Sequence, residues 1–421
     1  MPAARAWFLK RRAQVPAALL AFRRWHLVAL GVISLCSLGA RILWLDNPDR
    51  ALIFDEQYYV NAARVILGLH VPAHANYAGS IAGIDPNHEH PPLGWRFFSV
   101  VFGSAAILLI YWVVRRAGGG RWLAVGVAGL MAVDNLTLVH GRIATLDIFV
   151  LVFMLAAIGL YLRGSWLLAA IATGLALSTK LYAADLLIIV LTLELLLLRV
   201  PAESPLADIG MLRASTGTRF ARLGGFVVVS VMAYLVALTA MDAPLHGTLN
   251  PLQHTRDMVS YGGGLKSPSG PQGIASYPWQ WLLNQEPINY YSVNTNVFSG
   301  GKQIATHPVV AFQGLMSPFV IFLALPGLGL AAWLAWRERD RISALAVAWF
   351  AGTFLPFVVL AVFDQRTEYL YYMVVILPAV FIAVARLFSR RFLPPAATIG
   401  WVCALGYGFE SLYPFRTWTG H

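Results

Sequence analysis

The sequence is poor in charge. Charged residues make up 12% of the 421 positions, and only 20 residues are acidic, whereas hydrophobic residues make up 58%. A soluble domain carries a charged fraction about twice as large. This composition excludes an ordinary soluble protein and indicates a chain that crosses a membrane many times, since each bilayer-spanning helix needs about 20 mostly apolar residues.

Cysteine is also scarce. The two cysteines, Cys36 and Cys403, both lie in long apolar runs, so they predict neither a disulfide framework nor a thiolate metal site. The sequence has no P-loop and no visible internal repeat. These absences argue against an ATP-driven pump and against an inverted-repeat transporter.

The apolar runs predict an all-α polytopic membrane protein with about eleven transmembrane helices. We place them near residues 27–45, 95–114, 122–138, 143–162, 165–180, 182–198, 223–241, 308–336, 342–363, 369–386 and 395–413. Residues 1–26 form a basic segment expected in the cytoplasm, and residues 27–421 are expected to form one membrane domain. The long segments 46–94 and 242–307 would then lie outside.

The basic residues predict the orientation. With a cytoplasmic N-terminus, most of the 31 Lys and Arg residues fall in inside segments, and every inside turn carries at least one Arg. The C-terminus is then expected on the outer side. Because the charges are dispersed over many turns, the net charge of +11 is a topology signal and does not indicate nucleic-acid binding.

The outside segments are expected to carry short helices at the membrane surface. Residues 55–68 show apolar positions at helical spacing. Residues 277–291, "YPWQWLLNQEPINYY", concentrate Trp and Tyr, which predicts an anchor at headgroup level in preference to a sugar platform.

Most of the remaining outside charges fall in five short stretches at the outer ends of predicted spans or in the first outside segment. These are Asp55–Glu56 and residues 85–94, 134–147, 178–185 and 363–372. Charged groups near bilayer depth are costly, so they line a cavity or pair with one another. The pattern predicts one polar site that opens to the outer side. Its acids are suited to deprotonate a hydroxyl, and its Arg and Lys residues are suited to bind a phosphate.

Several motifs, in order, carry a family resemblance. They are "FDEQYYVNAARVILG", "HEHPPLGWRF", "DNLTLVHGRIATLDIFVLVFMLAAIGLYL", "GLALSTKLYA", "SYPWQWLLNQEPINYY", "RTEYLYYMVVILPAVFIAVA" and "LYPFRTW". From about residue 27 onward, the chain resembles the protein O-mannosyltransferase family of the glycosyltransferase C superfamily, in its short bacterial form. The resemblance implies the glycosyltransferase C fold, with juxtamembrane helices on the outer face.

The resemblance also implies a reaction. The family transfers mannose, with inversion, from a polyprenyl-phosphate carrier to Ser or Thr hydroxyls of secreted proteins. The expected partners are therefore the polyprenyl-phosphate-mannose donor lipid, a secreted acceptor protein and the lipid bilayer, with no nucleic acid. No cofactor and no metal are expected. The expected location is the plasma (inner) membrane, with the active site on its outer face.

The family's functional residues fall on particular positions of this chain. Its acidic pair matches Asp55 and Glu56, with Asp55 as the catalytic base. The resemblance assigns the donor phosphate to Arg142, Lys180 and Arg366. It assigns an acceptor or structural loop role to His90, Pro91 and Asp147.

Each assignment has a plainer structural alternative. Asp55 is also a good N-cap for the helix that follows it, and Glu56 fits a first-turn partner of the helix dipole. Arg142 and Asp147 are spaced to form a structural ion pair. Lys180 fits a side chain that reaches from a span to the interface.

Two rival functions remain open from the sequence. One is a glycosyltransferase of the same superfamily that acts on a glycolipid or a cell-wall glycan. The other is a transporter or channel. Polar residues scattered through the middle of spans would favour transport, whereas here they gather at one end.

Overall fold

The computed structural model describes residues 24–47, 52–67, 93–198, 216–243, 250–299, 301–389 and 394–414. Its helices are α3 (Trp25–Ile42), α4 (Glu56–Ile66), α5 (Leu93–Arg116), α6 (Arg121–Val133), α7 (Asn135–His140), α8 (Asp147–Arg163), α9 (Trp166–Thr179), α10 (Asp185–Leu197), α11 (Thr216–Asp242), α12 (Pro251–Gly264), α13 (Pro278–Trp281), α14 (Pro318–Ile321), α15 (Ala324–Arg337), α16 (Arg341–Phe363), α17 (Met373–Ser389) and α18 (Pro395–Ser411). The 3-10 turns η1 (Leu181–Ala184) and η2 (Leu370–Tyr372) precede α10 and α17.

The chain is a membrane protein by the length and composition of its helices. Five segments of the described chain are long and apolar enough to cross a bilayer, namely Trp25–Ile42, Leu93–Arg116, Gly217–Asp242, Arg341–Phe363 and Leu370–Ser389. Shorter apolar helices include Arg121–Val133 and Trp166–Thr179. The predicted number of eleven spans is not confirmed by these lengths.

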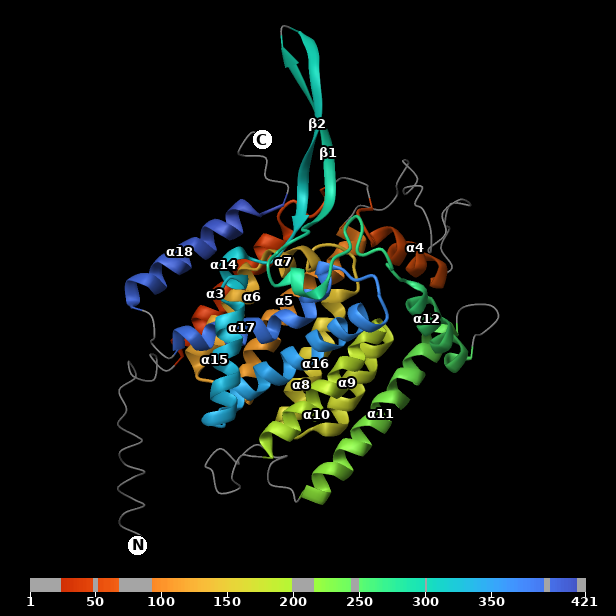
Figure 1. The fold of residues 1–421 in the computed structure, drawn as a ribbon, viewed down its shortest axis with the longest axis vertical. Helices are drawn as coiled ribbons and strands as arrows, with labels where there is room; N and C mark the ends of the chain where they lie inside the picture. The colour runs from red at the N-terminus through yellow and green to blue at the C-terminus, as the bar shows by residue number, and fades with distance from the viewer. Residues whose placement is uncertain are drawn as a thin grey trace.

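The all-α expectation is wrong in one place. Strands β1 (Ile288–Ser299) and β2 (Lys302–Gly314) form a two-stranded antiparallel sheet. The apolar run 308–336, expected as a single span, is divided among β2, α14 and α15. Its first part is rich in Val and Phe, which pair well across strands, and Pro318 begins a new helix because proline suits the first helical position. Figure 1 shows the hairpin rising from one end of the helical body.

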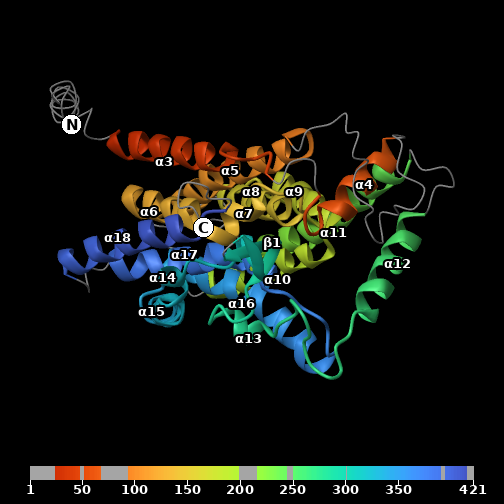
Figure 2. The same ribbon diagram turned by 90° about the horizontal axis from the view of Figure 1, so that it is seen from above.

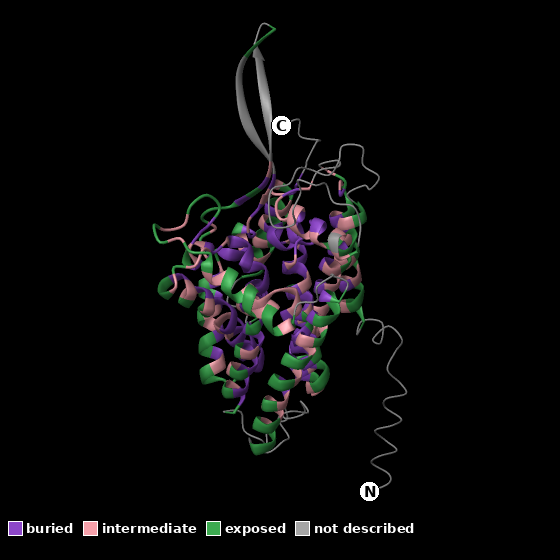
Figure 3. Cartoon of the chain, turned by 90° about the vertical axis from the view of Figure 1, so that its right-hand side faces the viewer, coloured by how far each residue is buried: buried purple, intermediate pink, exposed green. Residues whose placement is uncertain are grey.

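The helices pack into one bundle with α17 at its centre. Buried residues gather along the interior of the bundle and exposed ones cover its outside (Figure 3). Small residues allow close helix contacts, as is common in membranes. A Cβ atom on Gly174 of α9 would lie 2.5 Å from the Cβ of Ala233 in α11, and one on Gly352 of α16 would lie 2.7 Å from the side chain of Ile189 in α10.

The segment 242–307 differs in part from its prediction. It contains α12, α13 and the first strand, and Trp279 is exposed. Trp281, in contrast, is fully buried: its Nε1 donates to Ser276 Oγ over 2.9 Å, and its ring centroid lies 5.6 Å from that of Phe357. The prediction that this stretch anchors at headgroup level is therefore wrong for Trp281, because α13 packs inward against α16.

Polar residues hold the helix ends together beneath the hairpin. The Asp134 carboxylate accepts from the backbone N–H of Thr137 over 2.9 Å, which caps α7, and from that of Ser317 over 3.0 Å. Asn135 donates to the Leu412 carbonyl over 2.8 Å and accepts from the N–H of Leu315 over 3.1 Å. Viewed from above, β1 lies over the middle of the bundle, near α7 (Figure 2). These bonds define the end of the bundle at which the polar residues meet, called the hairpin end below.

Candidate active site

The Asp55 carboxylate is left without a hydrogen-bond partner among the described residues. It is half-buried, immediately before α4. The Asp55 backbone carbonyl accepts from the N–H groups of Tyr58 and Tyr59 over 3.0 and 3.2 Å. The side-chain bond at this helix end comes instead from Glu56, which accepts from the N–H of Ile53 over 3.0 Å. Within the described chain, Asp55 therefore does not act as a side-chain cap, and its carboxylate stays available for chemistry.

The residue before Asp55 adopts an unusual backbone conformation. Phe54 has a φ of 51°, which is uncommon for a bulky residue and costs about 1–3 kcal/mol. Its ring packs edge-on against Tyr290, at 4.7 Å between centroids, and against Tyr371 at 5.9 Å. Such conformations persist where surrounding contacts enforce them, and they concentrate at functional sites. The two tyrosines thus fix the turn that presents Asp55.

A buried ion pair lies beside Asp55. Lys180 directly follows α9, and its Nζ lies 2.8 Å from Oδ1 of Asp147, the first residue of α8. The Tyr182 hydroxyl donates to the same oxygen over 2.8 Å. Because the Asp147 side chain is 1% exposed, its charge needs these partners, and loss of either charge leaves the other buried and unpaired.

His140 connects this pair to the hairpin. Its Nδ1 lies 2.9 Å from Thr145 Oγ1 and 3.5 Å from Asp147 Oδ2, and its Nε2 lies 2.7 Å from the Tyr290 hydroxyl at the base of β1. Burial lowers the pKa of His140 to about 4. His140 is therefore neutral at physiological pH and acts here as a hydrogen-bonding link.

Aromatic rings surround the Lys180 ammonium. Its Nζ lies 5.1, 5.5 and 6.0 Å from the ring centroids of Tyr371, Tyr182 and Tyr59, respectively. These distances are within reach of a cation–π attraction. These three rings, called the tyrosine cage below, hold the Lys180 ammonium in one position next to Asp55.

Asp55 has the electrostatics of a base that works near neutral pH. Burial raises its pKa to about 6, the nearby Lys180 charge lowers the pKa, and Asp147 raises it. A general base acts best when its pKa lies close to the operating pH, because it is then ionised and still attracts a proton. Perturbed carboxylates of this kind indicate functional sites, although ion-pair networks also produce them.

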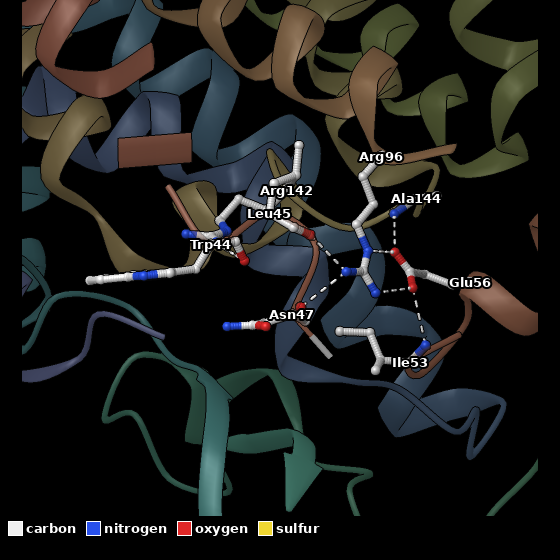
Figure 4. A network of polar contacts seen from close by, with 8 residues as sticks. All are labelled: Trp44, Leu45, Asn47, Ile53, Glu56, Arg96, Arg142 and Ala144. Atoms are coloured by element: carbon white, nitrogen blue, oxygen red, sulfur yellow. Dashed lines mark hydrogen bonds and ion pairs between the residues drawn. The ribbon is translucent and has the colours of Figure 1, made fainter. Parts of the chain in front are cut away.

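Glu56 is fully engaged in structural bonds. It is completely buried, and its two oxygens accept from Arg96 Nε and Nη2 over 2.8 and 2.9 Å (Figure 4). It also accepts from the N–H of Ala144 over 3.0 Å. Arg96 in turn donates to the carbonyls of Leu45 and Asn47. These contacts favour a structural role for Glu56 over a catalytic one. Through them, Glu56 connects the start of α4 to α5 and to the segment between α7 and α8.

Arg142 is also bound by the protein itself. Its guanidinium donates to the carbonyls of Ala40, Leu43 and Trp44 over 3.1, 2.7 and 3.0 Å, and to the Tyr413 hydroxyl over 2.8 Å. It therefore closes the C-terminal end of α3. No ion pair joins Arg142 to Asp147 in the described part of the chain, since Asp147 binds Lys180.

The remaining predicted residues make other contacts or lie outside the described ranges. Arg366 follows α16 and donates from Nη1 to the Gly262 carbonyl of α12 over 2.7 Å. Among described residues, no hydrogen bond or ion pair joins it to Asp55 or Lys180. His90 and Pro91 lie outside the described residues.

The site contains residues that the sequence did not single out. Arg96 binds Glu56, and Tyr290 reaches His140 from a hairpin that was not predicted. The rings of Tyr59 and Tyr371 complete the tyrosine cage around Lys180. One signal for Arg96 was present, because an arginine at the start of an apolar run must find a partner. No comparable sequence signal marks the tyrosines.

Comparisons with known proteins find similar sequences and similar folds. The sequence profile of the dolichyl-phosphate-mannose–protein mannosyltransferase family matches residues 74–242. A polyprenol-phosphate-mannose–protein mannosyltransferase of Mycolicibacterium smegmatis is 26% identical over 93% of this chain and 89% of that protein. A protein of the same description from Corynebacterium glutamicum is 24% identical over 70% and 66%.

Solved structures show the same fold. The S. cerevisiae protein O-mannosyltransferase Pmt1–Pmt2 complex, bound to the sugar donor, superposes with a TM-score of 0.68 at 12% identity, covering 93% of this chain and 90% of that one. The archaeal oligosaccharyltransferase AglB from Archaeoglobus fulgidus gives a TM-score of 0.50 at 15% identity, covering 93% and 56%. This chain thus shares its fold with these two structures.

Proposed function

We propose that this chain transfers mannose from a polyprenyl-phosphate carrier to Ser or Thr hydroxyls of secreted proteins, as its similarity to dolichyl-phosphate-mannose–protein mannosyltransferases supports. The observation that carries this proposal is the half-buried Asp55 carboxylate, left without a hydrogen-bond partner in the described chain beside the caged Lys180–Asp147 pair. A hydroxyl acceptor needs a base, and a phosphate leaving group needs a nearby cation.

The proposed reaction is a single displacement with inversion. The Asp55 carboxylate takes the proton of the acceptor hydroxyl while the hydroxyl oxygen bonds to the anomeric carbon. The bond from that carbon to the phosphate oxygen breaks, and the polyprenyl phosphate leaves with the electron pair. We assign Lys180 and Arg366 to the developing charge on the phosphate. Asp147 positions Lys180 through their 2.8 Å contact.

The proposal gives Arg142 a weaker part than the sequence indicated. To bind phosphate, its guanidinium would have to exchange some of its bonds to Ala40, Leu43, Trp44 and Tyr413. We therefore propose that Arg142 positions the end of α3, and that His90 and Pro91 belong to the acceptor loop.

The proposed location is the plasma (inner) membrane, with the site on its outer face. At the end of the bundle opposite the hairpin, Arg219 donates from Nε to Glu194 over 2.8 Å, and Arg386 donates to Asp340 over 3.0 Å. Both arginines are predicted inside residues, and their position at this end supports a cytoplasmic N-terminus and an outer C-terminus.

A transfer assay tests the function. Purified protein would receive polyprenyl-phosphate-mannose with a Ser-containing peptide and, in parallel, with a glycolipid acceptor. We expect mannosylated peptide and no mannosylated glycolipid. Mannosyl transfer to the glycolipid alone would assign the chain to the alternative glycosyltransferase class. Transfer to neither acceptor by intact, donor-binding protein would contradict the enzyme proposal.

Replacing Lys180 with Met is expected to shift the acidic limb of the pH profile upward. The Lys180 charge lowers the pKa of Asp55, so its loss raises that pKa above about 6. Because only the ionised base accepts a proton, kcat/KM should begin to fall at a higher pH than in the wild type. The measurement is kcat/KM between pH 5 and about 9, the range that spans this pKa. Lys180→Arg, which keeps the charge, is the control; an unshifted limb in Lys180→Met would remove Asp55 from the base role.

A further inference from the structure

The hairpin forms a sheet of its own, which contains no third strand from the described residues. Strand β1 has 12 residues and β2 has 13, and the sheet contains these two strands in the order β1–β2. Figure 1 shows the hairpin extending well beyond the helices. The outer edge of such a strand offers backbone N–H and C=O groups, and it is a template for pairing with another chain.

The two edges differ in how they are protected. Strand β2 contains Lys302 and Pro308, which are the residue types that natural proteins use to block an edge. Strand β1, "INYYSVNTNVFS", contains no proline and no charged residue. No proline therefore removes a backbone donor from β1, and its sequence contains no charge that discourages an added strand.

Strand β1 leads directly out of the candidate active site. At its base, the Tyr290 hydroxyl lies 2.7 Å from His140 Nε2, and the Tyr290 ring packs on Phe54, the neighbour of Asp55. The strand register is irregular between Asn289 and Tyr291, and such bulges redirect side chains beside active sites. An extended chain paired with β1 would therefore end close to Asp55.

We propose that the β1 edge binds the acceptor polypeptide as an added strand and so delivers its Ser or Thr hydroxyl to Asp55. This inference rests on the proposed protein mannosylation and names how its acceptor is recognised. Main-chain hydrogen bonds recognise an extended polypeptide through its backbone, with side-chain pockets adding specificity. A lipid or a glycan lacks the regular ladder of N–H and C=O groups, so the edge selects for protein acceptors.

The first test uses the wild-type protein and N-methylated peptides. A set of ten-residue peptides, each with one Ser, would carry a single backbone N-methyl group at successive positions away from that Ser. Along a strand, alternate N–H groups face the same neighbour. We expect kcat/KM to fall about tenfold or more at every second position, as expected for an unmade hydrogen bond, and to change little at the positions between. Uniform or irregular effects would overturn the proposal.

The second test shortens the hairpin. Residues 293–309 would be replaced by Asn-Gly, which forms a tight two-residue turn between the paired residues Ser292 and Val310. Tyr290 and Phe312 stay in place. We expect unchanged transfer to N-acetyl-serine amide and a loss of about tenfold or more, the effect of lost main-chain hydrogen bonds, in transfer to the ten-residue peptide.

The outcomes separate the two proposals. If the wild type mannosylates neither acceptor, the proposed function fails. If the shortened protein uses the long peptide as well as the wild type does, the β1 inference fails while the function stands. A change from dimer to monomer on shortening, measured by mass photometry, with unchanged use of the peptide would mean that the edge pairs two copies of this chain, which also overturns the inference.

Discussion

Replacing Asp55 with Asn is expected to lower the rate of mannose transfer by about 10²- to 10⁴-fold, the usual contribution of a general base. Asparagine has nearly the same shape, but its amide cannot take the proton of the acceptor hydroxyl. The carboxylate has no hydrogen-bond partner in the described chain, so the substitution breaks no described side-chain bond. Transfer from polyprenyl-phosphate-mannose to a Ser peptide, at saturating donor, measures the effect.

A matched control separates the base from a general effect of charge. Asp364 is a partly exposed carboxylate at the hairpin end that pairs with Lys266. Asp364→Asn is expected to keep nearly the full rate. Donor affinity should be similar in both variants, because Asp55 is proposed to act on the acceptor hydroxyl. Wild-type rates in Asp55→Asn would remove Asp55 from the mechanism.

Replacing Arg96 with Met is expected to lower the free energy of unfolding by about 3–5 kcal/mol, since it leaves the Glu56 carboxylate buried without its charged partner. Glu56 is fully buried, and Arg96 is 1% exposed and also binds two carbonyls at the end of the α3 segment. The loss should appear as a lower midpoint in chemical unfolding of the purified protein in detergent.

Two further variants test the reason for that loss. Arg256 is an exposed arginine on α12, and Arg256→Met is expected to change stability by no more than about 0.5 kcal/mol. Adding Glu56→Gln to Arg96→Met removes the unpaired charge and should restore part of the stability. If Arg96→Met were no more destabilising than Arg256→Met, the buried pair would not support the site.

Hydropathy predicted the long helices well and failed where backbone pairing decides the structure. Helices α5, α11 and α16 fall on the runs predicted near 95–114, 223–241 and 342–363. The run 308–336 was expected to be one span because a hydropathy average does not distinguish a strand from a helix. Its register with residues 288–299 depends on partners earlier in the chain, which no local pattern reveals.

The sequence predicted that the polar stretches gather in one site, but it did not reveal their partners. Residues from the stretches at 55–56, 134–147, 178–185 and 363–372 do meet at the hairpin end. That Asp147 pairs with Lys180 and not with Arg142 follows from the packing of α8 against α9, which sequence spacing does not give. The sequence also did not show that Glu56 binds Arg96, which lies 40 residues further along the chain.

The anomeric configuration of the product tests the central claim most directly. In the proposed mechanism, Asp55 activates the acceptor hydroxyl for one direct displacement at the anomeric carbon. NMR of a mannosylated Ser peptide, made by the wild-type protein from polyprenyl-phosphate-mannose of known configuration, would show the stereochemical result. We expect the opposite anomer to that of the donor. Retention of configuration, which requires two displacements and an intermediate on the enzyme, would contradict the account.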